Sequence, residues 1–207
     1  MSFISLNFVV LFACTFILYH TLPSRFRKAT LLTASCLFIG FYHLAFLITA
    51  LILTLTTFYL GKWIGQAKRE SGMKGIYFSG VCFLVVSWLA FRYADRLTNC
   101  HILFPLGISF YTFQAISYLT EIYWQEEEPE KSLPDFMIYM LFFMKFLSGP
   151  IERASDMLPQ LKSCKATDYT SMVYGMRLIV VGLIKKLILA DSIAPYIDGV
   201  FGSVYTA

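Results

Sequence analysis

The chain has 207 residues, of which 57% are apolar and only 14% are charged, whereas soluble domains average roughly half and a quarter. Aromatic residues make up 17% of the chain, and its mean hydropathy is +0.64. This composition excludes a disordered chain, a fibrous repeat and a secreted disulfide scaffold, and it leaves too few polar residues to cover a water-facing surface. We therefore predict an all-α polytopic transmembrane protein, whose length accommodates about five to seven spans of roughly 20 residues.

The basic residues are dispersed along the chain. The formal net charge is +4, but no run of Lys and Arg is longer than Lys185-Lys186, so we predict no nucleic-acid partner and attribute the positive charge to membrane topology. The five cysteines are widely spaced, without a disulfide or metal-binding pattern, and we interpret them as small apolar fillers. They are Cys14, Cys36, Cys82, Cys100 and Cys164.

The first apolar segments are separated by basic loops. Ser2 to Leu22 matches one membrane crossing, and the basic loop Arg25–Lys28 that follows it places the N-terminus outside under the positive-inside rule. Ala29 to Leu60 is too long for one crossing and has basic residues at both ends. We expect it to form a hairpin with short legs and a tip near residues 40–43.

The next segments lead to the middle of the chain. Gly75 to Phe91 is a further span, ended by an outside polar loop at Arg92–Arg96. Ile102 to Trp124 is long enough to return to the cytoplasm, but its polar residues favour a position facing a cavity or another helix. The acidic segment that follows, Gln125 to Lys131, is expected to be a solvated surface loop.

The C-terminal part is less regular. Leu133 to Leu147 is apolar, and Ser148-Gly149-Pro150 should break its helix because glycine is flexible and proline lacks an N–H donor. The chain up to Thr170 is expected to be polar and irregular, and Met172 to Leu189, with three basic residues, should lie partly in the membrane interface. Because no repeat or linker divides the chain, we predict one membrane-embedded unit over residues 1–207.

Few residues stand out as candidates for catalysis. The three histidines, His20, His43 and His101, lie near predicted membrane edges, where an imidazole reaches water without a special pocket. The sequence contains no serine-hydrolase elbow, P-loop, Rossmann, zinc-protease or EF-hand pattern. Composition therefore predicts a membrane protein without indicating a reaction, and it predicts no metal site.

Two segments carry more polar residues than a lipid-facing helix needs. In Pro105 to Tyr123, scattered polar residues indicate either a packed interior helix or a helix that lines a cavity. In Phe146 to Leu161, a helix break precedes Glu152, Arg153 and Asp156, which indicate either a local charge network or a site for an anionic ligand.

These segments belong to three motifs that occur in a recognisable order. They are PLGISFYTFQAISYLTEIY from Pro105, FFMKFLSGPIERASDMLPQL from Phe142 and GLIKKLILADSIAPYIDGVF from Gly182. Together they resemble the membrane-bound O-acyltransferase superfamily, in particular its bacterial polysaccharide branch of the alginate O-acetylase type. The motifs span residues 105–201, whereas the first hundred residues agree with the family only in hydropathy and in the number of spans.

The resemblance implies a multi-pass enzyme of the cytoplasmic (inner) membrane, of which this chain is the N-terminal portion with a partial family fold. Such an enzyme transfers an acetyl group from a cytosolic donor, acetyl-CoA, toward an extracytoplasmic polysaccharide such as alginate, without a bound cofactor. Its expected partners are membrane lipid, the polysaccharide acceptor and periplasmic or extracellular acetyl-transfer proteins. The family's general-base histidine lies beyond the third motif, so we expect these 207 residues to be inactive alone.

The resemblance also assigns individual residues, mostly in structural roles. Gly149-Pro150 is expected to shape a turn, and Asp191 is expected to cap a helix. A role in lining the reaction chamber is expected only for Gln114, Glu152 and Arg153. The remaining matched positions are Pro105, Gly107, Ser109, Phe113, Ile151, Lys186, Ala190, Ala194, Pro195 and Asp198.

Other functions stay open at this point. A catalytically silent membrane scaffold that binds a partner would keep the same motifs without the histidine. D-alanyl transfer to teichoic acid is the activity of a more distant branch with similar motifs. A transporter also needs polar residues inside the membrane.

Overall fold

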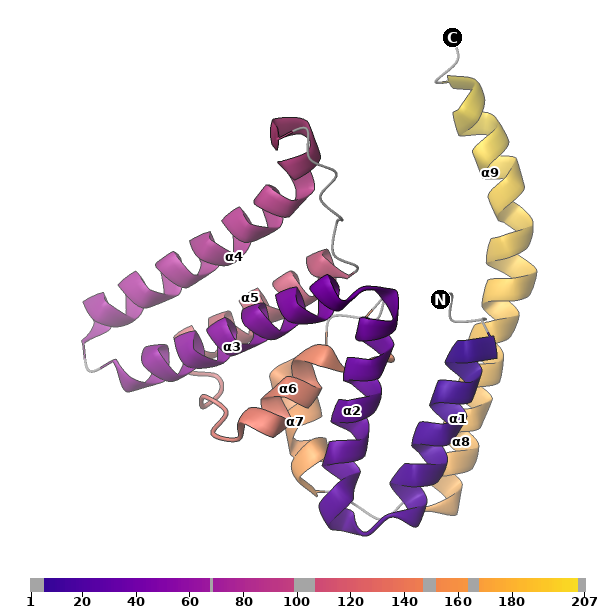
Figure 1. Ribbon diagram of the computed structural model, residues 1–207, viewed down its shortest axis with the longest axis horizontal. Helices are drawn as coiled ribbons and strands as arrows, with labels where there is room; N and C mark the ends of the chain where they lie inside the picture. The colour runs from indigo at the N-terminus through magenta and orange to yellow at the C-terminus, as the bar shows by residue number, and fades with distance from the viewer. Residues whose placement is uncertain (1–5, 68, 99–106, 147–151, 164–167, 205–207) are drawn as a thin grey trace. The chain divides into compact units, whose positions relative to one another are not determined.

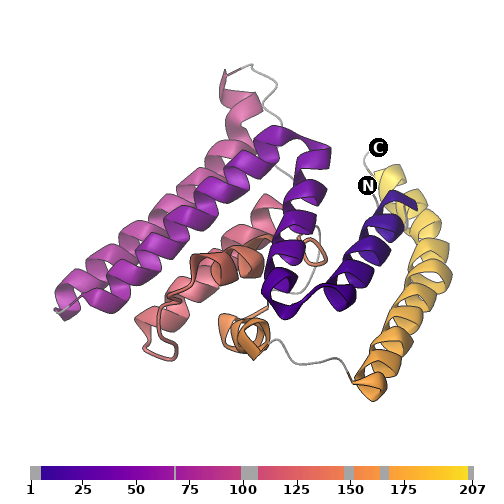
Figure 2. The same ribbon diagram turned by 60° about the horizontal axis from the view of Figure 1, so that its bottom comes forward.

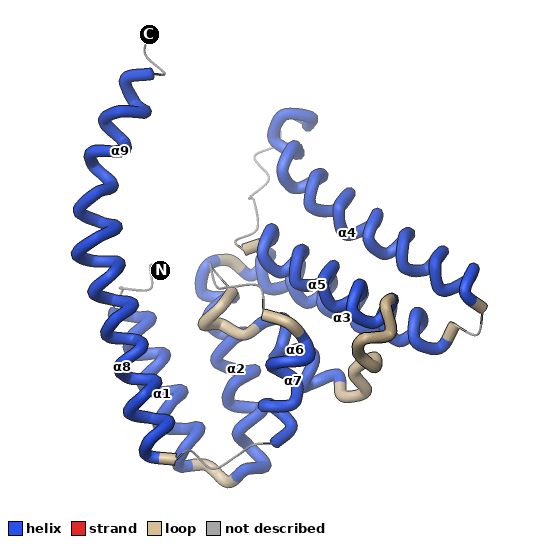
Figure 3. Tube along the Cα trace, turned by 180° about the vertical axis from the view of Figure 1, so that it is seen from behind, coloured by secondary structure: helices blue, strands red, loops and turns tan. Residues whose placement is uncertain are grey.

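The computed structural model describes residues 6–67, 69–98, 107–146, 152–163 and 168–204, with side chains described except at 94–98 and 198–204 (Figure 1). These residues form helices joined by loops, and no β-strand occurs among them (Figure 3). The all-α prediction is confirmed for this part of the chain. Two compact units are present, Met1–Cys164 and Lys165–Ala207. The single membrane-embedded unit and the orientation in the membrane stay predictions.

The first unit begins with three helices, α1 (Leu6–Thr21), α2 (Ser24–Tyr42) and α3 (Leu44–Gln66). α2 and α3 meet at His43, whose extended backbone interrupts the helix and whose Nδ1 accepts a hydrogen bond from the N–H of Ala45 at 3.2 Å. This side chain caps the start of α3. The break predicted near residues 40–43 is confirmed, but short legs are wrong, because α2 begins inside the basic loop and α3 continues past Leu60.

The next helix, α4 (Glu70–Thr98), shows that the predicted loop at Arg92–Arg96 is wrong. That segment contains no glycine or proline to interrupt helical hydrogen bonds, and long arginine side chains can reach water from an apolar helix. Within the described residues, two helices are long and apolar enough to cross a membrane, namely α3 and residues 70–93 of α4. These two helices lie side by side (Figure 2).

Three shorter helices complete the first unit, α5 (Ile108–Tyr123), α6 (Leu133–Leu141) and α7 (Ala154–Ser163). α6 ends before the predicted break at Gly149-Pro150, which lies outside the described residues. Phe142 leaves the helical conformation with a ψ of 116°, and the N–H of Phe143 donates to Oγ of Ser35 in α2 at 3.2 Å. A tertiary hydrogen bond therefore replaces a helical one at this point.

The helix α7 corrects the expectation of an irregular chain up to Thr170. Its apolar residues Ala154, Met157, Leu158 and Leu161 follow at the spacing of one helical face, and the first three are buried. The face packs against α6. The periodicity is therefore a signal for this helix that the polar composition of the segment obscures.

The helix α5 lies at the centre of the first unit, in contact with α3, α4 and α6. Leu119 of α5 and Phe136 of α6 are fully buried. A glycine permits the close approach of α3, because a Cβ at Gly61 would lie 2.8 Å from the ring of Tyr118. Small residues at such crossings let helix backbones approach each other in membrane proteins.

The second unit is a continuous helical segment with three parts, α8 (Tyr169–Ile184), the π-helical turn η1 (Lys185–Ala190) and α9 (Asp191–Val204). Asp191 has helical dihedral angles, φ −71° and ψ −24°, and its N–H bonds to the carbonyl of Lys186. Asp191 is the first residue of α9, which the chain enters from η1 without leaving helical geometry, and its capping role stays a prediction. Pro195 lies inside α9 and supplies no N–H to the carbonyl one turn earlier, so both irregularities fall in the third motif.

Gly107 provides a test of how α5 is positioned. Its φ is +74°, and a Cβ there would overlap the carbonyl oxygen of Phe146. Gly107→Ala should lower the free energy of unfolding by about 2–4 kcal/mol, since left-handed backbone and overpacking each cost roughly 1–3 kcal/mol. Helical circular dichroism during SDS unfolding of the detergent-solubilised protein measures this change.

The matched control for this test is Gly72→Ala in α4, where a Cβ would meet open space. Alanine should leave stability unchanged or raise it by about 0.5–1 kcal/mol. Equal effects at Gly107 and Gly72 would contradict the proposed close contact with Phe146.

Candidate functional site

Buried hydrogen bonds join α5 to α6 and to the start of α7 through one residue, Tyr139. The side-chain amide of Gln114 donates to the backbone carbonyl of Tyr139 at 2.9 Å, and the Tyr139 hydroxyl donates to the backbone carbonyl of Glu152 at 3.0 Å. Gln114 and Tyr139 are both buried, where an unsatisfied polar group costs roughly 1–3 kcal/mol. The structure therefore brings together the first and second sequence motifs at α6.

Lys145 places a positive charge in the same region. Its side chain is only 8% exposed, and its ammonium lies 3.5 Å from Oε2 of Glu152, 3.1 Å from Sδ of Met157 and 4.4 Å from the ring centre of Tyr139. A buried ammonium requires such partners. The sequence motifs did not single out Lys145. A signal was nevertheless present, because Lys145 is a lone lysine in the apolar run FFMKFL and lies seven residues before a glutamate.

A buried acid lies on α5, two helical turns after Gln114. Glu121 accepts a hydrogen bond from Oγ of Ser117 at 3.2 Å through Oε1, and its Oε2 is buried without a hydrogen-bond partner among the described residues. Spacings of three and four residues place Gln114, Ser117 and Glu121 on one face of the helix. The polar residues of α5 are thus mainly interior, as the packed-helix interpretation expects.

A pocket of about 270 Å³ borders this buried cluster. Glu152 and Met157, both partners of Lys145, line it from the second motif, and Arg27 and Lys28 line it from α2. The Arg27 guanidinium lies 5.3 Å from the ring centre of Tyr19, which also lines the pocket. The pocket therefore combines basic, aromatic and acidic groups at the edge of the first unit.

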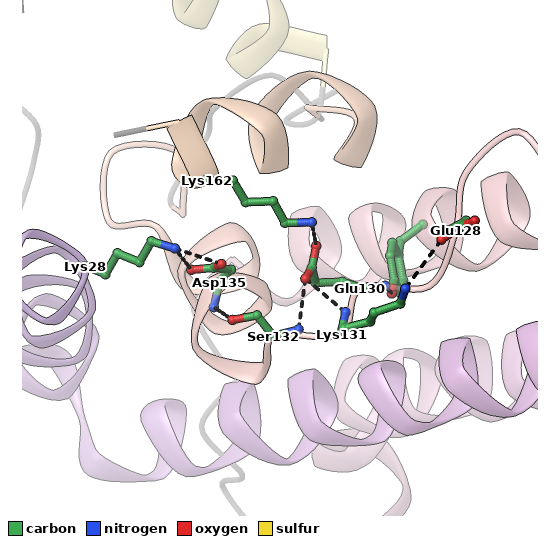
Figure 4. A network of polar contacts seen from close by, with 8 residues as sticks. Lys28, Glu128, Glu130, Lys131, Ser132, Asp135 and Lys162 are labelled. Carbon is green, nitrogen blue, oxygen red and sulfur yellow. Dashed lines mark hydrogen bonds and ion pairs between the residues drawn. The ribbon is translucent and has the colours of Figure 1, made fainter. Parts of the chain in front are cut away.

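A network of ion pairs and hydrogen bonds joins α2, the loop before α6, α6 and α7 (Figure 4). The carboxylate of Glu130 accepts hydrogen bonds from the N–H groups of Lys131 and Ser132 at 2.9 and 2.8 Å and pairs with the ammonium of Lys162 at 2.6 Å. Asp135 of α6 pairs with Lys28 of α2 at 2.7 Å. Glu130 is 4% exposed, so the prediction of a fully solvated acidic loop is wrong at this position.

The three predicted chamber residues lie in different surroundings. Glu152 lines the pocket, Gln114 is buried in the helix packing, and Arg153 is exposed with its backbone carbonyl accepting the N–H groups of Asp156 and Met157. Because Glu152 pairs with Lys145, its charge belongs to a network that extends beyond its sequence neighbours.

The other motif residues differ in their contacts and exposure. Oγ of Ser109 accepts a hydrogen bond from Nε1 of Trp88 at 3.0 Å, and Phe113 is 50% exposed. Lys186 is exposed in η1. The side chain of Asp198 and all of Pro105, Gly149, Pro150 and Ile151 lie outside what the structure describes. Across the described residues, no group of three His, Cys, Asp or Glu side chains could hold a metal ion.

Curated relatives extend over nearly the whole chain. The probable alginate O-acetylase of Azotobacter vinelandii is 31% identical over 97% of this chain and 44% of its own length, and that of Pseudomonas aeruginosa is 30% identical over 97% and 42%. The peptidoglycan O-acetyltransferase of Helicobacter pylori is 26% identical over 84% and 40%. No family model matches the chain, and no solved structure matches it significantly.

The composition and the two membrane-length helices define a helical membrane protein. The relatives narrow this class: the chain is homologous to bacterial O-acetyltransferases, which confirms the resemblance that the three motifs indicated. The chain spans less than half the length of the curated relatives it matches.

Glu130 offers a test of the network that holds α6 and α7. Glu130→Gln should reduce the free energy of unfolding by roughly 2–3 kcal/mol, because the amide oxygen can keep the two backbone N–H groups but the NH2 group then faces the ammonium of Lys162, which loses its buried anionic partner. Glu128→Gln is the matched control, since Glu128 is 88% exposed and lies 3.8 Å from Lys131, and it should change stability by less than about 0.5 kcal/mol. SDS unfolding measures both values, and a neutral Glu130 variant would show that the network does not stabilise the fold.

Proposed function

We propose that this chain forms part of a membrane-bound O-acyltransferase, a multi-pass protein of the cytoplasmic membrane with its N-terminus outside. The reaction transfers an acetyl group from acetyl-CoA on the cytosolic side toward a hydroxyl group of an extracytoplasmic, alginate-like polysaccharide. Periplasmic or extracellular proteins act as partners in the transfer. The observation that carries this proposal is the similarity of 97% of the chain to proteins named as alginate O-acetylases.

Acetyl transfer forms a carbon–oxygen bond to the acceptor, whose hydroxyl proton must pass to a base, and breaks the carbon–sulfur bond of a thioester, whose thiolate takes up a proton and leaves as a thiol. The described histidines have other contacts. His20 packs its ring against Phe16, with 4.5 Å between ring centres, and His43 uses Nδ1 to cap α3. We assign the base to neither of them, since the family resemblance implies a general-base histidine beyond the third motif.

Within this proposal, the described residues hold and shape the reaction chamber. Glu152 is the chamber residue, because it lines the pocket while Lys145 fixes its carboxylate. Gln114 supports the chamber indirectly through its hydrogen bond to Tyr139. Acetyl transfer is favoured over D-alanyl transfer to teichoic acid, since the relatives are named as acetylating proteins.

A chimera tests the acyltransferase proposal against a silent scaffold. These 207 residues replace the aligned segment of the Azotobacter vinelandii O-acetylase in a strain that lacks its own copy, and ester-linked acetate on alginate is measured after mild alkaline release. We expect acetate above the level of the deletion strain, because the aligned segment supplies the same motifs. A chimera that reaches the membrane in normal amount and acetylates nothing would contradict the proposal and favour the scaffold.

The isolated chain should behave differently from the chimera. Expressed in the same deletion strain, the 207 residues alone should restore no acetylation, because none of the three histidines lies in the family context. Membrane fractionation with an antibody confirms that the chain is present. Acetate on the polysaccharide that depends on this chain alone would overturn the expectation and place the base among its own residues.

A further inference from the structure

Glu121 is the exception among the buried charged side chains of the described residues. The other three each have an ion-pair partner, Glu130 with Lys162, Asp135 with Lys28 and Lys145 with Glu152. Glu121 is 6% exposed, and its Oε1 accepts a hydrogen bond from the Ser117 hydroxyl at 3.2 Å. Its Oε2 is buried without a hydrogen-bond partner among the described residues. A carboxylate in such surroundings is costly unless a cation compensates its charge.

Arg153 carries a positive charge that acts on this carboxylate. Among the described residues it is the one cation with an appreciable electrostatic effect on Glu121, whereas the exposed Glu126 and Glu127 repel the Glu121 carboxylate. The Arg153 side chain is itself exposed and makes no ion pair or hydrogen bond within the described part of the chain. Exposed side chains change rotamer readily, so this guanidinium can turn toward α5 without repacking the core.

We propose that Arg153 and Glu121 form an ion pair that joins the first and second motifs, and that both are positioning residues for Glu152. The role in the reaction rests on the proposed function, whereas the pair itself rests on the two unmatched charges. A guanidinium presents its N–H donors in a planar arrangement that matches a carboxylate. It therefore suits a buried carboxylate that has one oxygen without a partner, and such charge-assisted contacts are strong.

The pair acts on the segment that enters α7. Glu152 precedes Arg153 in the sequence, and its backbone carbonyl accepts a hydrogen bond from the Tyr139 hydroxyl at 3.0 Å. Its carboxylate lies 3.5 Å from the Lys145 ammonium. Both contacts come from α6 and the turn that follows it, whereas the pair with Glu121 adds a contact from α5. Two helices then fix this segment, so the Glu152 carboxylate keeps a defined position at the pocket wall.

A double-substitution cycle on the detergent-solubilised 207-residue chain tests the pair through the sign of one effect. With Arg153 present, Glu121→Gln removes the partner of the guanidinium and should raise the equilibrium constant of unfolding in SDS about tenfold. In the Arg153→Gln background, the same exchange removes an uncompensated buried charge and should lower this constant about threefold. An equal effect of Glu121→Gln in both backgrounds, as expected if a water molecule satisfies the carboxylate, would overturn the pair.

Matched controls make the same two exchanges at exposed positions. Arg25→Gln and Glu128→Gln each remove an exposed charge, and each should change the unfolding constant less than about twofold, with additive effects in the double variant. Arg153→Lys keeps the positive charge but loses the planar fork, so it should raise the unfolding constant less than Arg153→Gln does. Because Arg153 is exposed, its variants fold, and the cycle stays decisive even where Glu121→Gln alone is poorly stable.

Acetylation by the chimera separates positioning from stability. In membranes that contain equal amounts of chimera, Arg153→Gln should lower the ester-linked acetate on alginate about tenfold, because the Glu152 segment loses its contact with α5. The double variant Glu121→Gln/Arg153→Gln should regain stability relative to Arg153→Gln without regaining acetylation, since the pair is still missing. Recovery of both would reduce the pair to support of the fold and overturn the positioning role.

Failure of this inference and failure of the proposed function give different results. The unfolding cycle requires no activity, so an inactive unsubstituted chimera together with a coupled cycle refutes only the proposed function. An active chimera whose acetylation is unchanged by Arg153→Gln refutes the positioning role. An uncoupled cycle refutes the pair itself, whatever the chimera does.

Discussion

The position of α6 depends on hydrogen bonds made by Tyr139, because polar groups inside an apolar protein must find partners there. The Tyr139 carbonyl accepts the Gln114 amide and its hydroxyl reaches the Glu152 carbonyl, so a single residue connects α5 to the chain that enters α7. The ring of the same residue lies beneath the Lys145 ammonium. Backbone, hydroxyl and ring thus hold three different segments, and the pocket beside Glu152 takes its shape from their arrangement.

The ion pairs around this centre differ in which partner is buried. Asp135 and Glu130 are almost fully buried, at 4% and 3% side-chain exposure, while their lysines are 34% and 54% exposed. At Lys145 the order is reversed, since the lysine is 8% exposed and Glu152 is 42% exposed. The buried carboxylates of Asp135 and Glu130 hold their more exposed lysines at the protein surface. The buried ammonium of Lys145 instead holds the carboxylate of Glu152 at the pocket wall, because a buried positive charge requires a negative partner.

Sequence reasoning found the features that depend on local signals. The interruption at His43 follows from an apolar segment too long for one span, and the homology follows from three ordered motifs. The end of α6 could not be found in this way, because it depends on Ser35, which lies 108 residues away in sequence. The burial of Glu130 could not be predicted from the sequence for the same reason, since its partner Lys162 lies on α7. The helix α7 itself could have been predicted from the sequence, because its apolar residues recur at helical spacing.

Glu152 is a motif residue that contributes both to the packing of the helices and to the pocket. Its backbone carbonyl completes the hydrogen bonding of Tyr139, and its carboxylate both pairs with Lys145 and borders the pocket. Substitution of its side chain leaves the backbone hydrogen bond in place but removes the partner of a buried ammonium, so loss of a pocket contact and loss of stability occur together. The two contributions separate only at residues such as Gln160, which borders the pocket from an exposed position and is not part of the buried cluster.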